Sequence, residues 1–307
     1  MRRTATGPAN VEDFLTWLRV ERGRSANTVS SYRRDLLKAD SWLGELGTSL
    51  DAADGEQLAA FVASCQASGE SPASTARRVA ALRMYFRHQL AEGRIPADPT
   101  AMLEGVRVSA GVPKPLTIDE MERVIGSVTG DAPADLRDRA LLEFMFATGA
   151  RVSEACGLNT DDIDRGAMVV RLLGKGSKER VVPLGGAALR AIEEYLSGGA
   201  RDVLARIGGG RDDRNAVFLT NRGRRLNRQK AWDIVRSAGV RAGITRELSP
   251  HALRHTCATL MLSGGADLRI VQEMLGHASI STTQVYTKVS REHLLEVYRT
   301  SHPRALS

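Results

Sequence analysis

The chain has 307 residues, enough for two domains that each have their own core. Its 42% hydrophobic and 26% charged content is ordinary for a globular protein, and no apolar run approaches the ~20 residues that span a bilayer. The first ten residues carry two arginines but no apolar stretch. We therefore expect no secretory signal, no membrane partner and a cytoplasmic location.

The charge balance favours an anionic partner. The net charge is +7 at pH 7, and residues 1–107 carry 14 basic against 13 acidic side chains, whereas residues 108–307 carry 29 against 23. The basic excess therefore lies in the second part. The three cysteines, Cys65, Cys156 and Cys257, are widely spaced in apolar stretches, which predicts buried thiols and neither a disulfide framework nor a zinc site.

The first part of the chain is predicted to be a bundle of four helices. Apolar residues follow a helical stripe at 14–18, Ser25 or Asn27 caps a helix that runs through 32–43, a third helix covers 55–68, and a fourth follows Ser71-Pro72 and ends near Gly93. Pro113 and Pro115 then interrupt any periodicity. We expect a first domain at 1–107, a linker at 108–116 and a second domain at 117–307.

The second part is predicted to be mostly helical with a small antiparallel sheet, so the fold class is mainly α. Thr117 and Glu120 form a capping-box pattern, and an apolar helix around 141–146 stops at Gly149. Two β-branched runs around the turn at 174–177 predict a hairpin. Further helices are expected at about 186–197, 227–241, 251–263, 267–275, 280–288 and 291–299.

A helix start near residue 250 is the first candidate for an anion site. Ser249 and Pro250 suit the N-cap and the first helical position, and His251 and Arg254 then share one face of the first turn. A phosphate there would meet backbone amides, an imidazole and a guanidinium. The alternative is a surface ion pair beside a partly buried histidine. His255 is four residues from His251, but the motif lacks a metalloprotease glutamate, so we predict no metal.

Two upstream residues could complete a phosphoryl-transfer site. Arg151 follows the helix end at Gly149, where Glu154 could orient it. Lys175 lies at the hairpin tip, where a lysine could protonate a leaving oxygen, although Lys178 competes for that role. The alternatives are a surface Arg–Glu pair and a solvated lysine.

Two downstream residues supply a possible nucleophile and a further charge contact. His277 directly follows Gly276 at a predicted helix end, and Tyr286 comes nine residues later. A tyrosine with its ordinary pKa of about 10 needs nearby cations or a base to act as a nucleophile. In isolation Tyr286 could equally be a half-buried aromatic residue.

The order and spacing of these motifs resemble the tyrosine recombinase (integrase) family. The matching segments are Ala150–Glu154, Gly174–Gly176, His251–His255, Leu275–His277 and Tyr286, with Asn27–Leu36 similar to the helical core-binding domain. The resemblance covers nearly the whole chain. Within the family it is to the Xer recombinases, and segments 265–269, 281–284 and 302–305 are more similar to XerD-like than to XerC-like members.

The resemblance implies a mechanism that needs neither a metal nor another cofactor. Tyr286 would attack the scissile phosphate to give a 3′-phosphotyrosyl link and a 5′-hydroxyl. Arg151, Arg254 and His277 would stabilise the developing charge. His251 would assist proton transfer from the tyrosine or add a charge contact, and Lys175 would protonate the leaving oxygen.

The resemblance also implies partners. The two domains would clamp double-stranded DNA, two protomers would assemble with two XerC-like subunits, and an FtsK-type translocase would stimulate the resolution of chromosome dimers. Candidate DNA-backbone contacts are Arg33, Arg34, Arg77, Arg78 and Arg83 in the first domain, and Arg222, Arg224, Arg225 and Arg228 in the second.

Three other functions stay open from the sequence. A mobile-element integrase would share the chemistry and would be separated by its genomic neighbourhood. A type IB topoisomerase would share the nucleophile but would not need two recognition sites. A non-catalytic DNA-binding protein on this scaffold would need a broken set of catalytic residues, and the set here is intact.

Overall fold

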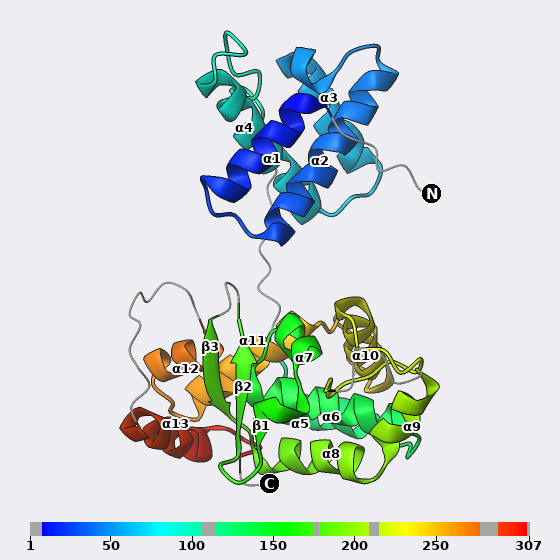
Figure 1. The fold of residues 1–307 in the computed structure, drawn as a ribbon, viewed down its shortest axis with the longest axis vertical. Helices are drawn as coiled ribbons and strands as arrows, with labels where there is room; N and C mark the ends of the chain where they lie inside the picture. Colours follow the sequence, from blue (N-terminus) through cyan, green and yellow to red (C-terminus); the bar gives the residue numbers. More distant parts are fainter. Residues whose placement is uncertain (1–7, 106–114, 175–177, 209–214, 277–287, 306–307) are drawn as a thin grey trace. The chain divides into compact units, whose positions relative to one another are not determined.

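The computed structural model describes residues 8–105, 115–174, 178–208, 215–276 and 288–305. The chain divides into two compact units, residues 1–111 and 112–307, which are described separately. The predicted fold class is confirmed: helices dominate, and a small antiparallel sheet lies in the second unit (Figure 1). Within the described ranges, no helix combines the length and apolar character needed to cross a bilayer.

The first unit is a bundle of four α-helices around an aromatic core. Phe14, Phe61, Tyr85 and Phe86 are among its fully buried side chains. Ser25, rather than Asn27, caps the second helix through a bond to its side chain from the Thr28 amide (3.3 Å). The elements are α1 (Ala9–Val20), α2 (Ala26–Glu45), the 3-10 turn η1 (Leu50–Ala52), α3 (Gly55–Ala67) and α4 (Pro72–Ala91).

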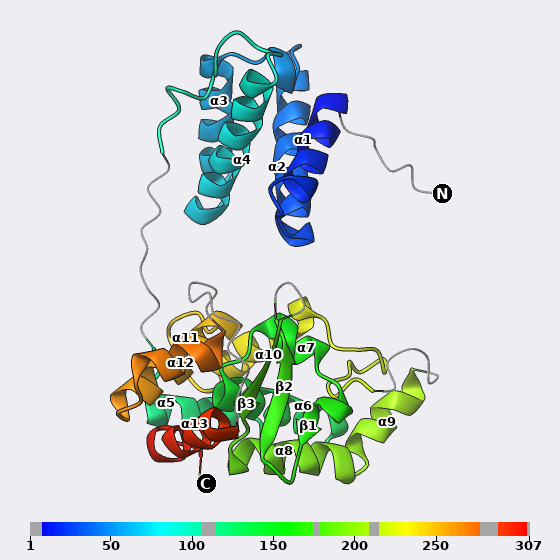
Figure 2. The ribbon, with the colours of Figure 1, turned by 60° about the vertical axis from the view of Figure 1, so that its left-hand side comes forward.

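The second unit contains the remaining elements, and its sheet lies against several of its helices (Figures 1 and 2). The helices are α5 (Ile118–Gly126), α6 (Pro133–Thr148), α7 (Val152–Gly157), η2 (Thr160–Asp162), α8 (Gly186–Ser197), α9 (Ala200–Ile207), α10 (Arg228–Arg241), α11 (Pro250–Ser263), α12 (Leu268–Leu275) and α13 (Lys288–Ser301). The strands are β1 (Ile163–Asp164), β2 (Val169–Leu173) and β3 (Glu179–Pro183).

Helix α6 is the centre of the second unit. Every residue from Ala140 to Thr148 is buried, and the stretch is apolar apart from Thr148 and Glu143, which pairs with Arg304. It packs against α8, α9 and α11. Leu116, which the sequence assigned to the linker, is buried in the same core, and its amide donates to Thr256 Oγ1 (3.0 Å).

The predicted hairpin is present and gains a third strand. β2 pairs antiparallel with β3, from Val169 opposite Pro183 to Leu173 opposite Glu179, and the short β1 pairs with β2. β1, α7 and α9 were missed because two, six and eight residues are too few for a clear period. The helix expected at 291–299 begins at Lys288 and ends at Ser301, and most of the one expected at 280–288 lies outside the described residues.

Candidate functional site

Three arginines converge on the carboxyl end of α12. Its last carbonyls belong to Met274 and Leu275, and Gly276 follows in the left-handed conformation (φ 66°). Arg180 Nε donates to the Met274 oxygen (2.8 Å), Arg254 Nη2 to that of Leu275 (2.6 Å) and Arg151 Nη2 to that of Gly276 (2.9 Å). Carbonyls at a helix end lack helical partners and carry partial negative charge, so they can hold guanidinium groups.

Arg254 is buried at the start of α11. Ser249 caps this helix, accepting from the Ala252 amide (3.2 Å), and Pro250 is its first residue, as predicted. Arg254 is 7% exposed and also donates to the Gly149 carbonyl (2.7 Å). Burial, followed by the positive charges of Arg151 and Arg180, lowers its pKa to about 10, so it remains charged at neutral pH.

Arg151 is placed by the sharp end of α6. Gly149 adopts φ 57°, and a Cβ atom there would lie 2.6 Å from Leu275 Cδ2, so only glycine allows α12 to pack this closely. Arg151 then caps α7, and its side chain is 38% exposed. Its Nη1 donates to Glu154 Oε1 (2.9 Å), which confirms the predicted pairing.

Glu154 is the acidic centre of the cluster. Arg180 Nη1 and Nη2 donate to its two oxygens (2.6 and 2.8 Å), and the Arg151 amide donates to Oε2 (2.7 Å). Burial alone would raise the pKa of this carboxyl, but the hydrogen bonds and charges of Arg180 and Arg151 outweigh it and hold the pKa below its ordinary value. The cluster thus combines three guanidiniums with one ionised carboxylate.

The structure brings together part of the predicted catalytic set. Arg151 and Arg254 donate to adjacent carbonyls, and His251 is exposed one turn before Arg254 on α11. Lys175, His277 and Tyr286 lie outside the described residues. Lys178, the competitor of Lys175, is exposed, and its carbonyl accepts from the Gly174 amide (2.8 Å) where the hairpin loop closes.

The arginines expected to contact DNA from the first unit are mostly paired. Arg33 contacts Glu12, Arg77 contacts Asp35, and Arg83 donates to the Leu103 carbonyl. Arg78 is 12% exposed and donates to Glu70 Oε1 (2.9 Å), whereas the exposed Arg34 donates to residues of its own helix.

The arginines of the second unit that are expected to contact DNA lie in the turn before α10 and at the first residue of that helix. Arg222, Arg224 and Arg228 are exposed. Arg225 is half-buried and donates to the carbonyls of Cys156 and Leu158 (both 3.2 Å) and to Asn159 Oδ1 (2.7 Å). Arg225 therefore also ties this turn to the end of α7, and DNA contact by all nine arginines remains a prediction.

Arg180 is the residue that sequence reasoning missed. Side chains alternate between the two faces of β3, and Arg180 lies on the same face as the inward-pointing Val182. This alternation indicates that Arg180 is buried. A charged side chain at an inward strand position must find a partner, and Glu154 is that partner. No local pattern identifies Glu154 as this partner, because the two residues are 26 positions apart in the sequence.

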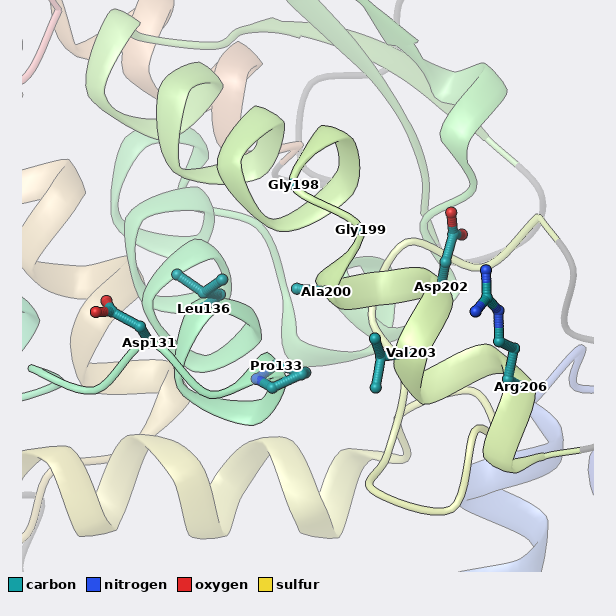
Figure 3. Close-up of a pocket in the computed structure, with 9 residues that line it drawn as sticks. All are labelled: Asp131, Pro133, Leu136, Gly198, Gly199, Ala200, Asp202, Val203 and Arg206. Carbon is teal, nitrogen blue, oxygen red and sulfur yellow. The ribbon is translucent and has the colours of Figure 1, made fainter.

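A separate groove of about 350 Å³ lies at the other end of α6 (Figure 3). Pro133 and Leu136 of the first turns of α6 and residues of the α8–α9 connection line it. The groove lies at the amino end of α6, whose 16 residues make it about 24 Å long, whereas Arg151 follows its carboxyl end. The groove is therefore distinct from the arginine cluster.

Two family models match the chain. Residues 114–293 match the phage integrase family, and residues 11–93 match the phage integrase N-terminal SAM-like domain. Among curated proteins, the tyrosine recombinase XerD of Bifidobacterium longum is 47% identical over 298 residues, covering 96% of this chain and 97% of that protein. The XerD of Mycobacterium tuberculosis is 46% identical over 307 residues, with coverage of 96% and 97%.

Solved structures agree with these matches. XerH site-specific recombinase bound to a palindromic difH substrate, in a post-cleavage complex, gives a TM-score of 0.65 at 26% identity and covers 94% of this chain and 84% of that one. A lambda integrase dimer bound to a core site gives a TM-score of 0.63 at 21% identity, with 91% and 98% covered, which supports the fold alone.

Proposed function

Because this chain belongs to the tyrosine recombinase (phage integrase) family and is a site-specific DNA recombinase, we propose that the arginine cluster at the end of α12 binds the scissile phosphate. The observation that carries the proposal is the adjacency of Arg151 and Arg254, which donate to neighbouring carbonyls immediately before His277. Guanidiniums held by neutral carbonyls keep their charge for an anion.

In the proposed reaction the tyrosine and the leaving oxygen exchange places on phosphorus. Tyr286 Oη forms the bond to phosphorus as the bond to the 5′-oxygen breaks, which leaves a 3′-phosphotyrosyl link. Lys175 donates a proton to the departing 5′-oxygen, and His251 assists removal of the tyrosine proton or adds a charge contact. The link conserves the phosphodiester energy, so a 5′-hydroxyl of a partner duplex can reverse the step.

Arg151, Arg254 and His277 stabilise the charge that develops on the non-bridging oxygens. Their effect is largest in the transition state, when a monoanionic phosphate becomes more negative. Glu154 is shared between Arg151 and Arg180, so three cations face one anion and the site keeps a positive excess. A fixed cluster of this kind does not have to reorganise during the reaction.

Covalent trapping tests this assignment. Purified protein is mixed with a nicked duplex that contains the Xer site of its own chromosome, and adducts are separated on a denaturing gel. The wild type and the matched control Tyr32→Phe form a protein–DNA adduct, whereas Tyr286→Phe does not. An adduct with Tyr286→Phe would exclude Tyr286 as the nucleophile, and none with the wild type, despite DNA binding, would favour the non-catalytic alternative.

The wider role that we propose is the resolution of chromosome dimers. Its support is the near-full-length similarity to proteins named XerD. The enzyme would act in the cytoplasm, with residues 1–107 and 117–307 clamping double-stranded DNA and the nine predicted arginines contacting its backbone. Two copies would assemble with two XerC-like subunits, stimulated by an FtsK-type translocase.

A plasmid with two directly repeated sites separates this role from its rivals. Deletion of the DNA between the sites should require both the XerC-like subunit and the translocase. Relaxation of a plasmid with no site would indicate a topoisomerase. Recombination by this chain alone at the ends of a mobile element would indicate an integrase.

A further inference from the structure

Arg180 is the member of the arginine cluster that holds Glu154 through a two-point fork. All three of its nitrogens donate inside the cluster, Nε to the Met274 carbonyl and the other two to Glu154, and the residue is 8% exposed. Arg151, by comparison, is 38% exposed. Because these bonds reach both Glu154 and the end of α12, a change at position 180 affects both neighbours.

Arg180 shares the carboxylate that orients Arg151. Glu154 Oε1 accepts from both Arg180 Nη1 (2.6 Å) and Arg151 Nη1 (2.9 Å). If the fork from Arg180 were lost, Glu154 would pair with Arg151 alone and offset more of its charge. The positive excess offered to a phosphate would then fall.

Arg180 also sets the position of the chain just before His277. It holds the Met274 carbonyl, and a Cβ atom on Gly276 would lie 3.2 Å from Arg180 Cδ. Since Gly276 has φ 66°, glycine allows both the turn and this close approach. One buried side chain from β3 thus contacts the end of α12 and the carboxylate that holds Arg151.

We propose that Arg180 is a positioning residue for transition-state charge stabilisation, acting through Glu154 on Arg151 and through the Met274 carbonyl on the end of α12. The inference rests on the proposed role of Arg151 at the scissile phosphate. Lysine at position 180 would keep the buried charge but not the planar fork, so it would pair with Glu154 without fixing its orientation.

The test compares two substrates. One nicked duplex carries an ordinary scissile phosphate and the other a methylphosphonate, which has no negative charge on its non-bridging atoms and so depends less on guanidinium positioning. We expect Arg180→Lys to slow adduct formation on the phosphodiester about 10- to 100-fold, with unchanged DNA binding, and to stay within about threefold of the wild type on the methylphosphonate.

Arg137→Lys is the matched control. Arg137 is a buried arginine on α6 in the same unit, 2% exposed, and donates to Asp138, Asn221 and the Leu219 carbonyl rather than to the cluster. It should lower thermal stability as Arg180→Lys does but leave the cleavage rate of the folded protein unchanged on both substrates.

The outcomes separate this inference from the proposed function. Equal slowing of Arg180→Lys on both substrates, or none on the phosphodiester, would overturn the positioning role while the wild-type adduct still supports the recombinase. If Arg180→Lys does not fold, the same comparison of the two substrates with Arg180→Gln tests the positioning role. If the wild type forms no adduct with the phosphodiester, the proposed recombinase function itself fails, and with it the basis for a positioning role of Arg180.

Discussion

Two buried carboxylates, one in each unit, show how hydrogen-bond geometry determines whether burial raises a carboxyl pKa or ion pairing lowers it. Asp35 in the first unit is 3% exposed and contacts Arg77 and Arg78, while Glu154 in the second is 5% exposed and contacts Arg180 and Arg151. Burial raises the pKa of Asp35 despite its arginines. At Glu154 the arginines win and the pKa is lowered.

The difference lies in the number of aligned donors. Glu154 receives a two-point fork from Arg180, a bond from Arg151 and a backbone amide. Asp35 receives one bond from Arg77, which is 40% exposed, and a 3.9 Å contact from Arg78. A buried charge is stabilised only when its hydrogen-bonding capacity is filled, so the donors around Glu154 outweigh its burial and those around Asp35 do not.

The largest expected effect is the loss of stability when the charge of Glu154 is removed. Glu154→Gln leaves Arg180 buried without a counter-charge, so we expect the free energy of unfolding to fall by about 3–5 kcal/mol. Urea denaturation at pH 7, followed by circular dichroism, measures it. A loss below about 1 kcal/mol would show that the Met274 carbonyl and solvent suffice for Arg180.

The next effect is on the rate of cleavage. Arg151→Ala should slow adduct formation about 10²- to 10³-fold, because it removes a cation directed at the developing charge. Arg77→Ala, whose guanidinium contacts Asp35 in the first unit, should leave the cleavage rate of bound DNA unchanged and reduce the salt dependence of binding by about one charge. Equal cleavage by Arg151→Ala and wild type under single turnover would contradict the phosphate site.

His302 extends the comparison to a base. It is 4% exposed, its Nε2 lies 3.3 Å from the Phe146 carbonyl, and its Nδ1 accepts from the Arg304 amide (3.1 Å). Burial, only partly opposed by the Phe146 carbonyl, lowers its pKa to about 4. Both nitrogens are engaged in the neutral form, so protonation would break the bond from Arg304.

The sign of the resulting pH dependence follows from that lowered pKa. Above pH 6.5 both folded and unfolded states are neutral at His302, and below it only the unfolded state gains the proton, until the pH falls through about 4. Lowering the pH from 7 to 5 should therefore reduce stability by about 2 kcal/mol through this residue. His302→Gln should remove that part of the pH dependence, and an unchanged slope would contradict the assignment.

Local signals explain why much of the fold was predictable. The Ser249-Pro250 start of α11, the capping box at Thr117 and the hairpin each depend on neighbouring residues, and the structure contains all three. Arg151 and Glu154 are likewise only three residues apart, so their pairing could be predicted.

Long-range contacts account for what was not predicted. Three arginines, from the start of α7, from β3 and from α11, reach the same helix end, and Arg151 lies 125 positions before the Gly276 carbonyl that it contacts. The convergence depends on how closely α6 and α12 pack at Gly149, which is a property of the assembled core. Arg180 could be suspected from its inward strand position, but its partner could not be named.

The smallest expected effect is at Asp35 itself. Asp35→Asn should change the free energy of unfolding by less than about 1 kcal/mol at pH 7, because burial of the charged form already opposes its ion pairs and asparagine keeps an acceptor for Arg77. Since the folded-state pKa lies above the ordinary value, the charge is unfavourable at neutral pH, and this cost disappears as the pH falls below about 3.8. Urea denaturation of Asp35→Asn beside Glu154→Gln measures the contrast directly. A loss at Asp35 as large as that at Glu154 would mean that one exposed arginine can stabilise a buried carboxylate as well as a buried fork does, and the geometric explanation of both networks would fail.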